Sequence, residues 1–245
     1  MARCAVSAVR GDIMIYKKIY SWSIFLTALF SFEVWHLVNL IENIPVNDHN
    51  LQIIIKFAVG AFFSFGFFIG MVSLFYLLIE KFKFIKKLFF ASSYIEGVWL
   101  CFGIPEDKKI VLIIQQIEQT PDKVSIYGQK FDYNNGNPTF RGSISSTSAS
   151  LDDDKHLLNS TYISDKKDKI NAGFSSFQLI SKGKKAPDMF FGYSSNFSHG
   201  KRSAIGKRYC DYDKMPDLKE IVKEAKRFYE DQKELFDNIE CNAGA

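Results

Sequence analysis

Three arginines and four aromatic residues lie in short segments of the second half of the chain that are rich in β-branched and aromatic side chains. An arginine guanidinium presents a planar fork of donors that suits phosphate, and an aromatic face stacks on a nucleobase. Around a small cavity this mixture could bind a phosphorylated nucleotide, although arginine and tyrosine are also ordinary on the outer face of a strand. The set comprises Trp99, Tyr127, Arg141, Tyr193, Arg202, Arg208 and Tyr209.

Two of these arginines share one face of the last predicted strand. Side chains alternate between the two faces of a strand, so Arg202 and Arg208 fall on the same face as Ala204, Gly206 and Cys210. Small neighbours suit a crowded interior. We therefore expect both arginines to point into the domain.

The direction of Arg141 is left open by the same rule. Alternation groups Arg141 with Ser143 and Ser145, on the face opposite Phe140 and Ile144. An inward arginine that binds ligand and a solvated outer arginine both fit this pattern. Arg141 is retained as a candidate ligand-binding residue.

Sequence patterns typical of catalysis are missing. The chain contains no Walker A, His-Glu-x-x-His, Cys-x-x-Cys or Gly-x-Ser-x-Gly pattern. Its four histidines are His36, His49, His156 and His199, which leaves little for a histidine-based active site. Three consecutive acids, Asp152 to Asp154, could bind a divalent cation, but their place in a predicted turn favours a solvated loop. We predict that the protein is not an enzyme and has no catalytic residue, metal or cofactor.

The elements that would position the candidate residues are strands, because short apolar runs alternate with turn residues along this half of the chain. Eight runs are found: Tyr94–Phe102, Lys109–Glu118, Lys123–Phe131, Thr139–Ser148, His156–Ser164, Lys169–Ile180, Met189–Asn196 and Lys201–Cys210. Short links favour an up-and-down antiparallel meander, and eight strands are about the number at which a meander closes on itself. We predict an all-β barrel over residues 93–213 that binds a ligand, with an open sandwich as the alternative.

A C-terminal amphipathic helix is predicted over residues 214–245. Pro216 and Asp217 are plausible start signals. One apolar stripe follows at helical spacing, formed by Leu218, Ile221, Val222, Ala225, Phe228, Tyr229, Leu235, Phe236 and Ile239. The helix either covers the barrel, which we favour, or mediates self-association.

Two apolar stretches precede the predicted barrel, Ile19–Ile41 and Leu51–Ile79. As a helix the first would span roughly 34 Å at about 1.5 Å per residue, enough for a bilayer core of about 30 Å. The second carries one charge, Lys56, which is close enough to its start to reach the headgroups. We predict a two-helix transmembrane hairpin over residues 19–80.

The distribution of basic residues predicts the orientation of this hairpin. Basic side chains flank it on both outer sides, at Arg3, Arg10, Lys17 and Lys18 and at Lys81, Lys83, Lys86 and Lys87, while its connection has none. Cytoplasmic segments carry such an excess, so we expect the N-terminal segment 1–18, the basic linker 81–92, the barrel and both termini to be cytoplasmic. The polar residues before Met14 add nothing to a span, so translation could start at Met14 instead of Met1.

Four residues inside the hairpin invite a functional interpretation. Gly66 and Gly70 form a small-xxx-small pair, which would let helices pack closely either within the hairpin or between protomers. Glu33 and His36 lie one helical turn apart, and ionisable groups at membrane depth are functional candidates. We favour a hydrogen-bonded contact between helices for this pair over a metal site.

This arrangement resembles the two-transmembrane, β-strand-rich effectors of CBASS, the bacterial antiphage systems that signal with cyclic oligonucleotides. The resemblance extends from about Met14 to Glu240 and rests on the hairpin, the basic linker and eight strands that begin with "EGVW" and end in "GKRYCDYD". Gly97 and Trp99 are similar to the Gly-x-Trp element of lipocalins. In lipocalins that tryptophan packs near a basic residue of the last strand, which implies such a role for Arg208 or Arg202.

The resemblance implies a mechanism without catalysis. A cyclic di- or trinucleotide would enter the barrel, promote homo-oligomers and cluster the hairpins, which would then disrupt the lipids of the bacterial inner membrane. No nucleic acid polymer is implied as a partner. In one alternative, a guard-type effector stays silent while the nucleotide is bound and is released when phage deplete it. Two others are a membrane-tethered lipocalin-like protein that binds a lipid or metabolite, and a barrel that only docks a protein.

Overall fold

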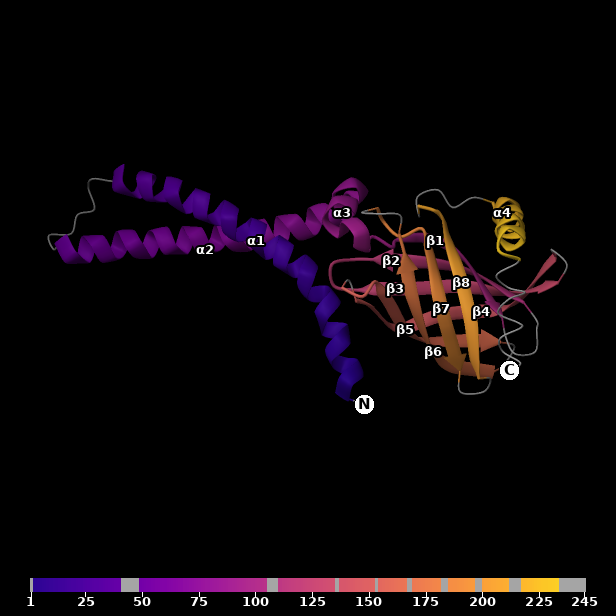
Figure 1. Cartoon of the computed structure of the whole chain (residues 1–245). Coiled ribbons are helices and arrows are strands. Elements are labelled where there is room, and N and C mark those ends of the chain that lie inside the picture. The colour runs from indigo at the N-terminus through magenta and orange to yellow at the C-terminus, as the bar shows by residue number, and fades with distance from the viewer. Residues whose placement is uncertain are drawn as a thin grey trace. The chain divides into compact units, whose positions relative to one another are not determined.

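The computed structural model describes residues 2–40, 49–104, 110–134, 137–152, 154–166, 169–181, 185–196, 200–211 and 217–233 (Figure 1). The chain divides into two compact units, of which one runs from Ile13 to Phe89 and the other contains the barrel. Each unit is described by itself below.

The unit Ile13–Phe89 contains α1 (Ala2–Leu40) from Ile13 onward and all of α2 (His49–Lys81). Residues later in α1 contact residues earlier in α2. Tyr16 of α1 lies against Tyr76 of α2, whereas Phe30 of α1 stacks on Phe67 of α2 with 3.9 Å between ring centroids. The two helices therefore form an antiparallel pair.

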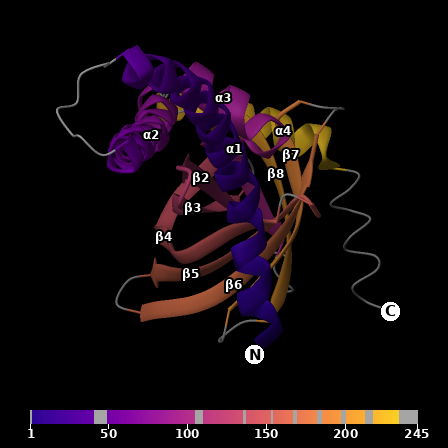
Figure 2. The ribbon, with the colours of Figure 1, turned by 90° about the vertical axis from the view of Figure 1, so that its left-hand side faces the viewer.

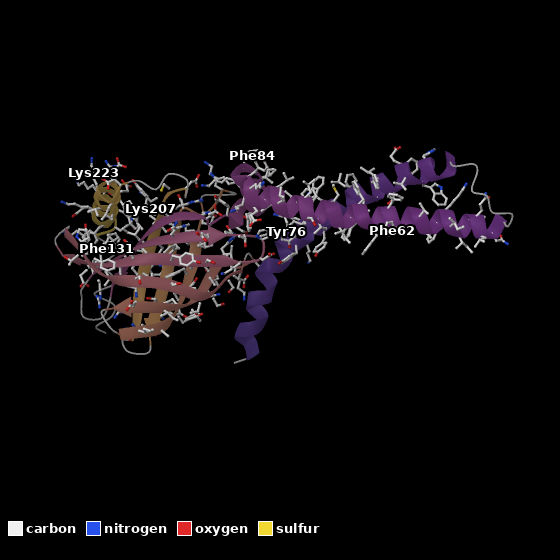
Figure 3. The ribbon with its side chains drawn as sticks, turned by 180° about the vertical axis from the view of Figure 1, so that it is seen from behind. Phe62, Tyr76, Phe84, Phe131, Lys207 and Lys223 are labelled. Atoms are coloured by element: carbon white, nitrogen blue, oxygen red, sulfur yellow. The ribbon has the colours of Figure 1, made fainter. Side chains whose placement is uncertain are left out.

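Only one of the described helices is long and apolar enough to cross a membrane. Within α2, the stretch Asn50–Lys81 contains an 18-residue segment with a mean hydropathy of 2.2, and this segment is almost unburied. Its side chains project outward, as at Phe62, which is 76% exposed (Figure 3). In α1 the polar side chains between Ser21 and Glu33 dilute the apolar stretch. Length and composition thus support one span, and the second span of the expected hairpin remains a prediction.

The expected basic linker is mostly helical. Helix α3 (Lys83–Phe90) follows α2 after one residue, and a 3₁₀ turn, η1 (Ala91–Ser93), leads to the barrel.

The second unit is a closed antiparallel barrel in which each strand pairs with its neighbours in sequence and β1 pairs with β8. Figure 2 shows β2 to β6 following one another along one wall. The strands are β1 (Gly97–Ile104), β2 (Val111–Gln119), β3 (Val124–Asn134), β4 (Asn137–Asp152), β5 (Leu157–Lys166), β6 (Lys169–Ile180), β7 (Met189–Asn196) and β8 (Lys201–Cys210). The predicted up-and-down barrel is confirmed, and the open sandwich is excluded.

The meander gives the barrel two different ends. Connections β1–β2, β3–β4, β5–β6 and β7–β8 lie at one end, which we call the polar end, and connections β2–β3, β4–β5 and β6–β7 lie at the other, which we call the apolar end. The chain enters β1 at the apolar end. Side chains fill the interior near the apolar end, whereas the interior near the polar end contains a cavity.

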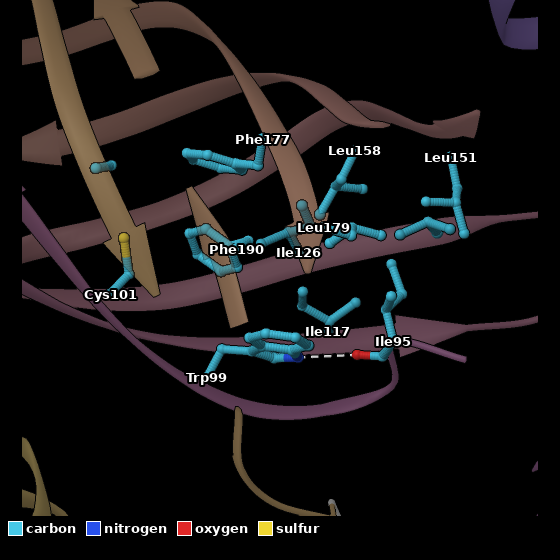
Figure 4. Close-up of a cluster of buried hydrophobic side chains, with 12 residues drawn as sticks. Ile95, Trp99, Cys101, Ile117, Ile126, Leu151, Leu158, Phe177, Leu179 and Phe190 are labelled. Atoms are coloured by element: carbon cyan, nitrogen blue, oxygen red, sulfur yellow. Dashed lines mark hydrogen bonds between the residues drawn. The ribbon is translucent and has the colours of Figure 1, made fainter. Parts of the chain in front are cut away.

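The apolar half of the interior is tightly packed (Figure 4). Trp99 is fully buried, its ring lies 5.3 Å from that of Phe190, and Phe190 lies 4.5 Å from Phe177. The indole N–H of Trp99 donates to the carbonyl oxygen of Ile95 at 2.8 Å, so its polar atom is satisfied. Aliphatic side chains complete this inner cluster, among them Ile117, Ile126, Leu151, Leu158 and Leu179.

Helix α4 (Leu218–Asp231) covers part of the outer face of the barrel. Its side chains Ile221, Ala225 and Phe228 are buried against the outward-facing residues of β1, β2, β3 and β8. An ion pair between Lys207 of β8 and Glu224 joins the helix to the wall at 3.2 Å. The prediction that this helix covers the barrel is confirmed.

The other proposed parts of the C-terminal helix have mixed outcomes. Asp217 is its N-cap but makes no capping hydrogen bond with its side chain. Pro216, Leu235, Phe236 and Ile239 lie outside the described residues.

Candidate functional site

A cavity of about 60 Å³ lies in the polar half of the barrel interior. Hydroxyl and amide side chains from β4 to β7 contribute much of its wall. Its aliphatic floor includes Ile113, Ile126 and Ala204, which belong to or pack against the inner cluster. Three basic side chains also line it, Lys130 from β3, Arg141 from β4 and Arg202 from β8.

Lys130 is the most enclosed of these cations. Its ammonium group donates to the hydroxyl of Ser164 at 2.8 Å and lies 5.3 Å from the centre of the Tyr162 ring. Burial, and to a smaller extent the nearby charges of Arg202 and Arg141, lower the pKa of Lys130 from its ordinary value of 10.5 to about 8. Lys130 is therefore held in a position where its positive charge is poorly compensated.

Arg202 is the second residue of β8 and lines the same cavity. Among the described residues, its guanidinium has no hydrogen-bond or ion-pair partner. A partly buried arginine without an acceptor keeps its donors available for a ligand. The predicted inward direction of Arg202 is confirmed.

Arg141 points inward because of a β-bulge. The pairing of β3 with β4 shifts between Lys130 and Phe131, which lie opposite Gly142 and Phe140, so Arg141 is the extra residue. As a result Arg141 lines the cavity, whereas strict alternation would have separated it from Ile144, another residue of the lining.

The guanidinium of Arg141 already has an acidic partner. It donates to a carboxylate oxygen of Asp132 at 2.7 Å, and the Arg141 side chain is only 18% exposed. Because this ion pair neutralises much of its charge, Arg141 contributes less free positive charge to the cavity than Lys130 or Arg202.

Hydroxyl groups surround the cations. Ser160 and Ser175 face each other across β5 and β6 with 2.6 Å between their oxygens, and Tyr162 donates to the carbonyl oxygen of Ser195 at 3.4 Å. Burial raises the pKa of the Tyr162 phenol, so this group stays neutral. The cavity thus combines positive charge with neutral hydrogen-bonding groups.

Arg208 lies at the opposite, apolar end and is fully engaged. Its guanidinium donates to the carbonyl oxygens of Tyr94 and Glu96, pairs with Asp211 at 3.1 Å and lies 4.7 Å from the centre of the Tyr94 ring. Its strand partner across the β1–β8 pair is Trp99. Both residues were expected to bind ligand, but neither lines the cavity. They close the barrel instead.

Gly97 has a conformational role at this closed end. Its φ of 142° lies in a region that side chains rarely adopt, and a Cβ atom would be 2.6 Å from the carbonyl oxygen of Cys210. Only glycine lets β1 pass so close to the last strand.

The three candidate tyrosines do not line the cavity. Tyr127 is 42% exposed on the outer face of β3. Tyr193 contacts the exposed Phe174 ring and lies under the ammonium group of Lys201. Tyr209 packs on the outer cluster beneath α4.

A second bulge explains the position of Tyr209. Val98 pairs with Cys210 but Trp99 pairs with Arg208, so Tyr209 is skipped and the alternation of β8 is interrupted. Cys210 consequently packs on the outer cluster, and its expected place on the inner face of β8 is wrong.

The four residues singled out in the hairpin do not contact the partner helix in the ways expected. Glu33 and His36 are exposed, and His36 packs edge to face on Phe32 of its own helix. A Cβ atom added at Gly66 or Gly70 would meet nothing within 4 Å, so these glycines are not needed for packing within the hairpin.

Serines supply the interhelical hydrogen bond that was expected from Glu33 and His36. The hydroxyl of Ser31 donates to that of Ser64 at 2.7 Å. This pair was missed, because single serines in an apolar helix are common and give little signal.

Metal binding finds no support in the geometry. Among the residues that the structure describes, no group of three or more histidine, cysteine, aspartate or glutamate side chains is placed to hold an ion. Asp152 was expected in a solvated loop, but it is the last residue of β4 and is buried. It accepts a hydrogen bond from the backbone N–H of Lys155 at 3.2 Å.

Comparisons of the chain with protein-family models, with curated proteins and with solved structures find no match. The chemistry of the cavity must therefore be argued from its own residues. Two inward cations without a carboxylate partner, Lys130 and Arg202, together with several hydroxyl groups, suit an anion with oxygen acceptors.

Lys130 and Tyr162 were missed by the sequence analysis, although a signal for Lys130 was present. Alternation from the apolar residues Val124 and Ile126 leads through Gly128 to Lys130 on the same inner face. Tyr162 gave no comparable signal, because its nearest neighbours on the same face of β5 are the polar residues Ser160 and Ser164.

Proposed function

We propose that the protein is a membrane-anchored receptor whose barrel binds a cyclic di- or trinucleotide, as the resemblance to CBASS effectors implies. The single observation that supports this best is the unpaired Arg202 facing the same cavity as Lys130 and Arg141. Phosphodiester groups are anionic and could serve as the missing partner of Lys130 and Arg202. Guanidinium groups also bind phosphate oxygens with good geometry.

The proposed output is self-association of the helical hairpin in the inner membrane, followed by disruption of the bilayer. In this proposal both α1 and α2 cross the membrane, and the barrel and both termini are cytoplasmic. The exposed pair of Gly66 and Gly70 on α2 would then be free for contacts between protomers. A ligand changes such an equilibrium only if it binds the two states with different affinities.

In the guard-type alternative the nucleotide binds the same site but keeps the protein inactive. The geometry of the cavity therefore does not distinguish activation from inhibition by the nucleotide. A lipid-binding barrel is less well supported. The apolar half of the interior, where an acyl chain would lie, is filled by Trp99, Phe177 and Phe190.

Thermal unfolding of the full-length protein in detergent tests the proposal. A panel of cyclic di- and trinucleotides is added to the wild type, to Arg202→Gln and to Lys201→Gln, an exposed basic residue next to it on β8. At about 100 times its Kd, a single-site ligand should add roughly 2.7 kcal/mol to the free energy of unfolding. We expect this stabilisation in the wild type and in Lys201→Gln, and a clearly smaller stabilisation in Arg202→Gln. No stabilisation by any member of the panel would refute the proposal.

Measurements of cell viability decide whether the nucleotide activates or inhibits the protein. We expect expression of the full chain to be harmless until the binding nucleotide is supplied, and toxic afterwards. Toxicity without the nucleotide, relieved by supplying it, would select the guard-type mechanism. No toxicity under either condition would favour a tethered binding protein.

A further inference from the structure

We propose that the cavity holds one phosphoryl group of the ligand between Lys130 and Arg202, while the sugars and bases remain outside it at the polar end. This inference rests on the proposed nucleotide-binding function and adds which part of the ligand enters the barrel. It also makes Lys130, which belongs to no recognised sequence motif, the main contact of the phosphoryl group.

The size of the cavity supports a single phosphoryl group. Its volume is about 60 Å³. A cavity needs roughly 10–15 Å³ of space filled by the water itself to hold one water, so this cavity has room for several waters. A phosphoryl group fits this space, whereas a whole cyclic dinucleotide does not.

The charges around Lys130 leave a site for an anion. Lys130 and Arg202 have no carboxylate partner among the described residues, and Arg141 is paired with Asp132. The other titratable groups of the wall do not offset this charge. Burial keeps the thiol of Cys101 on β1 and the phenol of Tyr162 on β5 neutral.

The remaining acid of the lining is Asp165 at the end of β5. Its side chain is exposed, on the opposite face of the strand from Tyr162 and Ser164. It is therefore solvated and does not neutralise Lys130. A bound phosphoryl group would supply the missing negative charge and accept the hydrogen bonds of Lys130 and Arg202.

Binding of an anion should also be linked to a proton on Lys130. In the free protein, burial and the charges of Arg202 and Arg141 hold the pKa of Lys130 at about 8. A phosphoryl group placed between Lys130 and Arg202 reverses the sign of the local field and raises that pKa. Affinity should therefore be constant below pH 8 and fall above it, as the free protein loses the proton that the complex needs.

The experiment is a titration of the full-length protein in detergent with inorganic phosphate, with the nucleotide panel and with short-chain phosphatidate. Phosphatidate separates a lipid headgroup from a nucleotide as the source of the phosphoryl group. The variants are Lys130→Gln, Arg202→Gln and the outer-face control Lys201→Gln, and calorimetry is performed at pH 7.5 and at pH 9.5. Phosphate is mostly a dianion at both pH values, because its second pKa is near 6 to 7.

We expect phosphate to bind the wild type weakly and to compete with the nucleotide. Lys130→Gln and Arg202→Gln should each weaken both ligands about ten- to a hundredfold, the range for hydrogen bonds to charged groups. Lys201→Gln should leave both affinities within about twofold. The wild-type affinity should drop about tenfold or more between the two pH values, and Lys130→Gln should lose this dependence.

The outcomes separate this inference from the proposed function. Unchanged nucleotide affinity in Lys130→Gln, with no competition by phosphate, would overturn the inference and leave the nucleotide receptor intact. Binding of phosphate and phosphatidate but of no nucleotide, abolished by Lys130→Gln, would support the phosphoryl pocket and overturn the nucleotide receptor. Absence of binding by every anion would overturn both.

Discussion

Arg202 and Arg208 lie on the same strand and face the same interior, yet their surroundings differ completely. Arg208, at the apolar end, donates to two backbone carbonyl oxygens and pairs with Asp211. Arg202, at the polar end, has no such partner among the described residues. The comparison shows that an inward arginine in a barrel is a ligand candidate only when the fold leaves its donors unused.

The same contrast extends to the two halves of the interior. The apolar half is filled by large side chains in direct contact, so its contribution is to stability. The polar half keeps an open space lined by uncompensated positive charge, which costs stability and is expected where a site must bind an anion.

The largest expected effect is in the filled half. Trp99→Ala should lower the free energy of unfolding by about 3–5 kcal/mol, because it removes a fully buried ring and leaves a cavity. Trp99→Phe, the control, should cost less because it preserves most of the contact with Phe190. Urea unfolding measures both. A loss below about 1 kcal/mol for the alanine variant would mean that this half is not tightly packed.

The stability of the barrel should respond differently to the same change at the two arginines. Arg208→Gln should destabilise the barrel by about 1–3 kcal/mol, because the carbonyl oxygens of Tyr94 and Glu96 lose their donor. Arg202→Gln should leave stability within about 0.5 kcal/mol, since it breaks no contact, and should weaken ligand binding. Paired unfolding and binding measurements decide this. Equal destabilisation by the two variants would contradict the distinction.

Lys130→Met should stabilise the protein without ligand by on the order of 1 kcal/mol at pH 7, because it removes a charge that burial disfavours. The sign follows from the lowered pKa. Between pH 8 and the ordinary value of 10.5 the unfolded state binds more protons, so wild-type stability should rise with pH in this window.

The variant should lack that rise. Unfolding in urea at pH 7 and pH 10 measures the difference for both proteins, and Lys201→Met is the matched control for loss of a lysine. If the wild type were instead less stable at pH 10 than at pH 7, and Lys130→Met showed the same trend, the charge of Lys130 would not be disfavoured by burial.

The smallest effect is expected outside the barrel. Tyr127→Ala should change the free energy of unfolding by less than about 0.5 kcal/mol, because this side chain is largely exposed on the outer wall. Nucleotide affinity should be unchanged, as measured by calorimetry. If Tyr127→Ala lowered the nucleotide affinity, part of the ligand would contact the outer face of the barrel, and the binding site would not be confined to the interior.

Much of the fold was predictable because it depends on local patterns. Turn residues and alternating runs defined eight strands, three of them with the bounds that the structure shows, from Lys169, Met189 and Lys201 onward. The short connections then left the up-and-down barrel as the favoured closure. The apolar stripe of residues 218–229 likewise identified the helix that covers the wall.

The site was only partly predictable, because alternation fails wherever one strand carries an extra residue. The bulge at Arg141 turns this side chain inward beside Ile144, and the skipped Tyr209 turns Cys210 outward. A bulge depends on pairing with a strand distant in sequence, so no local pattern reports it.

The sequence by itself determined the number of strands, the C-terminal amphipathic helix and an apolar segment long enough to span a membrane, and it favoured the closed barrel over an open sandwich. Tertiary structure alone decided which basic side chains remain without a partner: it paired Arg208 with carbonyl oxygens, paired Arg141 with Asp132, and left Lys130 and Arg202 facing one cavity. The physical reason is that the charge of a residue is local, whereas its compensation depends on neighbours that only the closed barrel brings together.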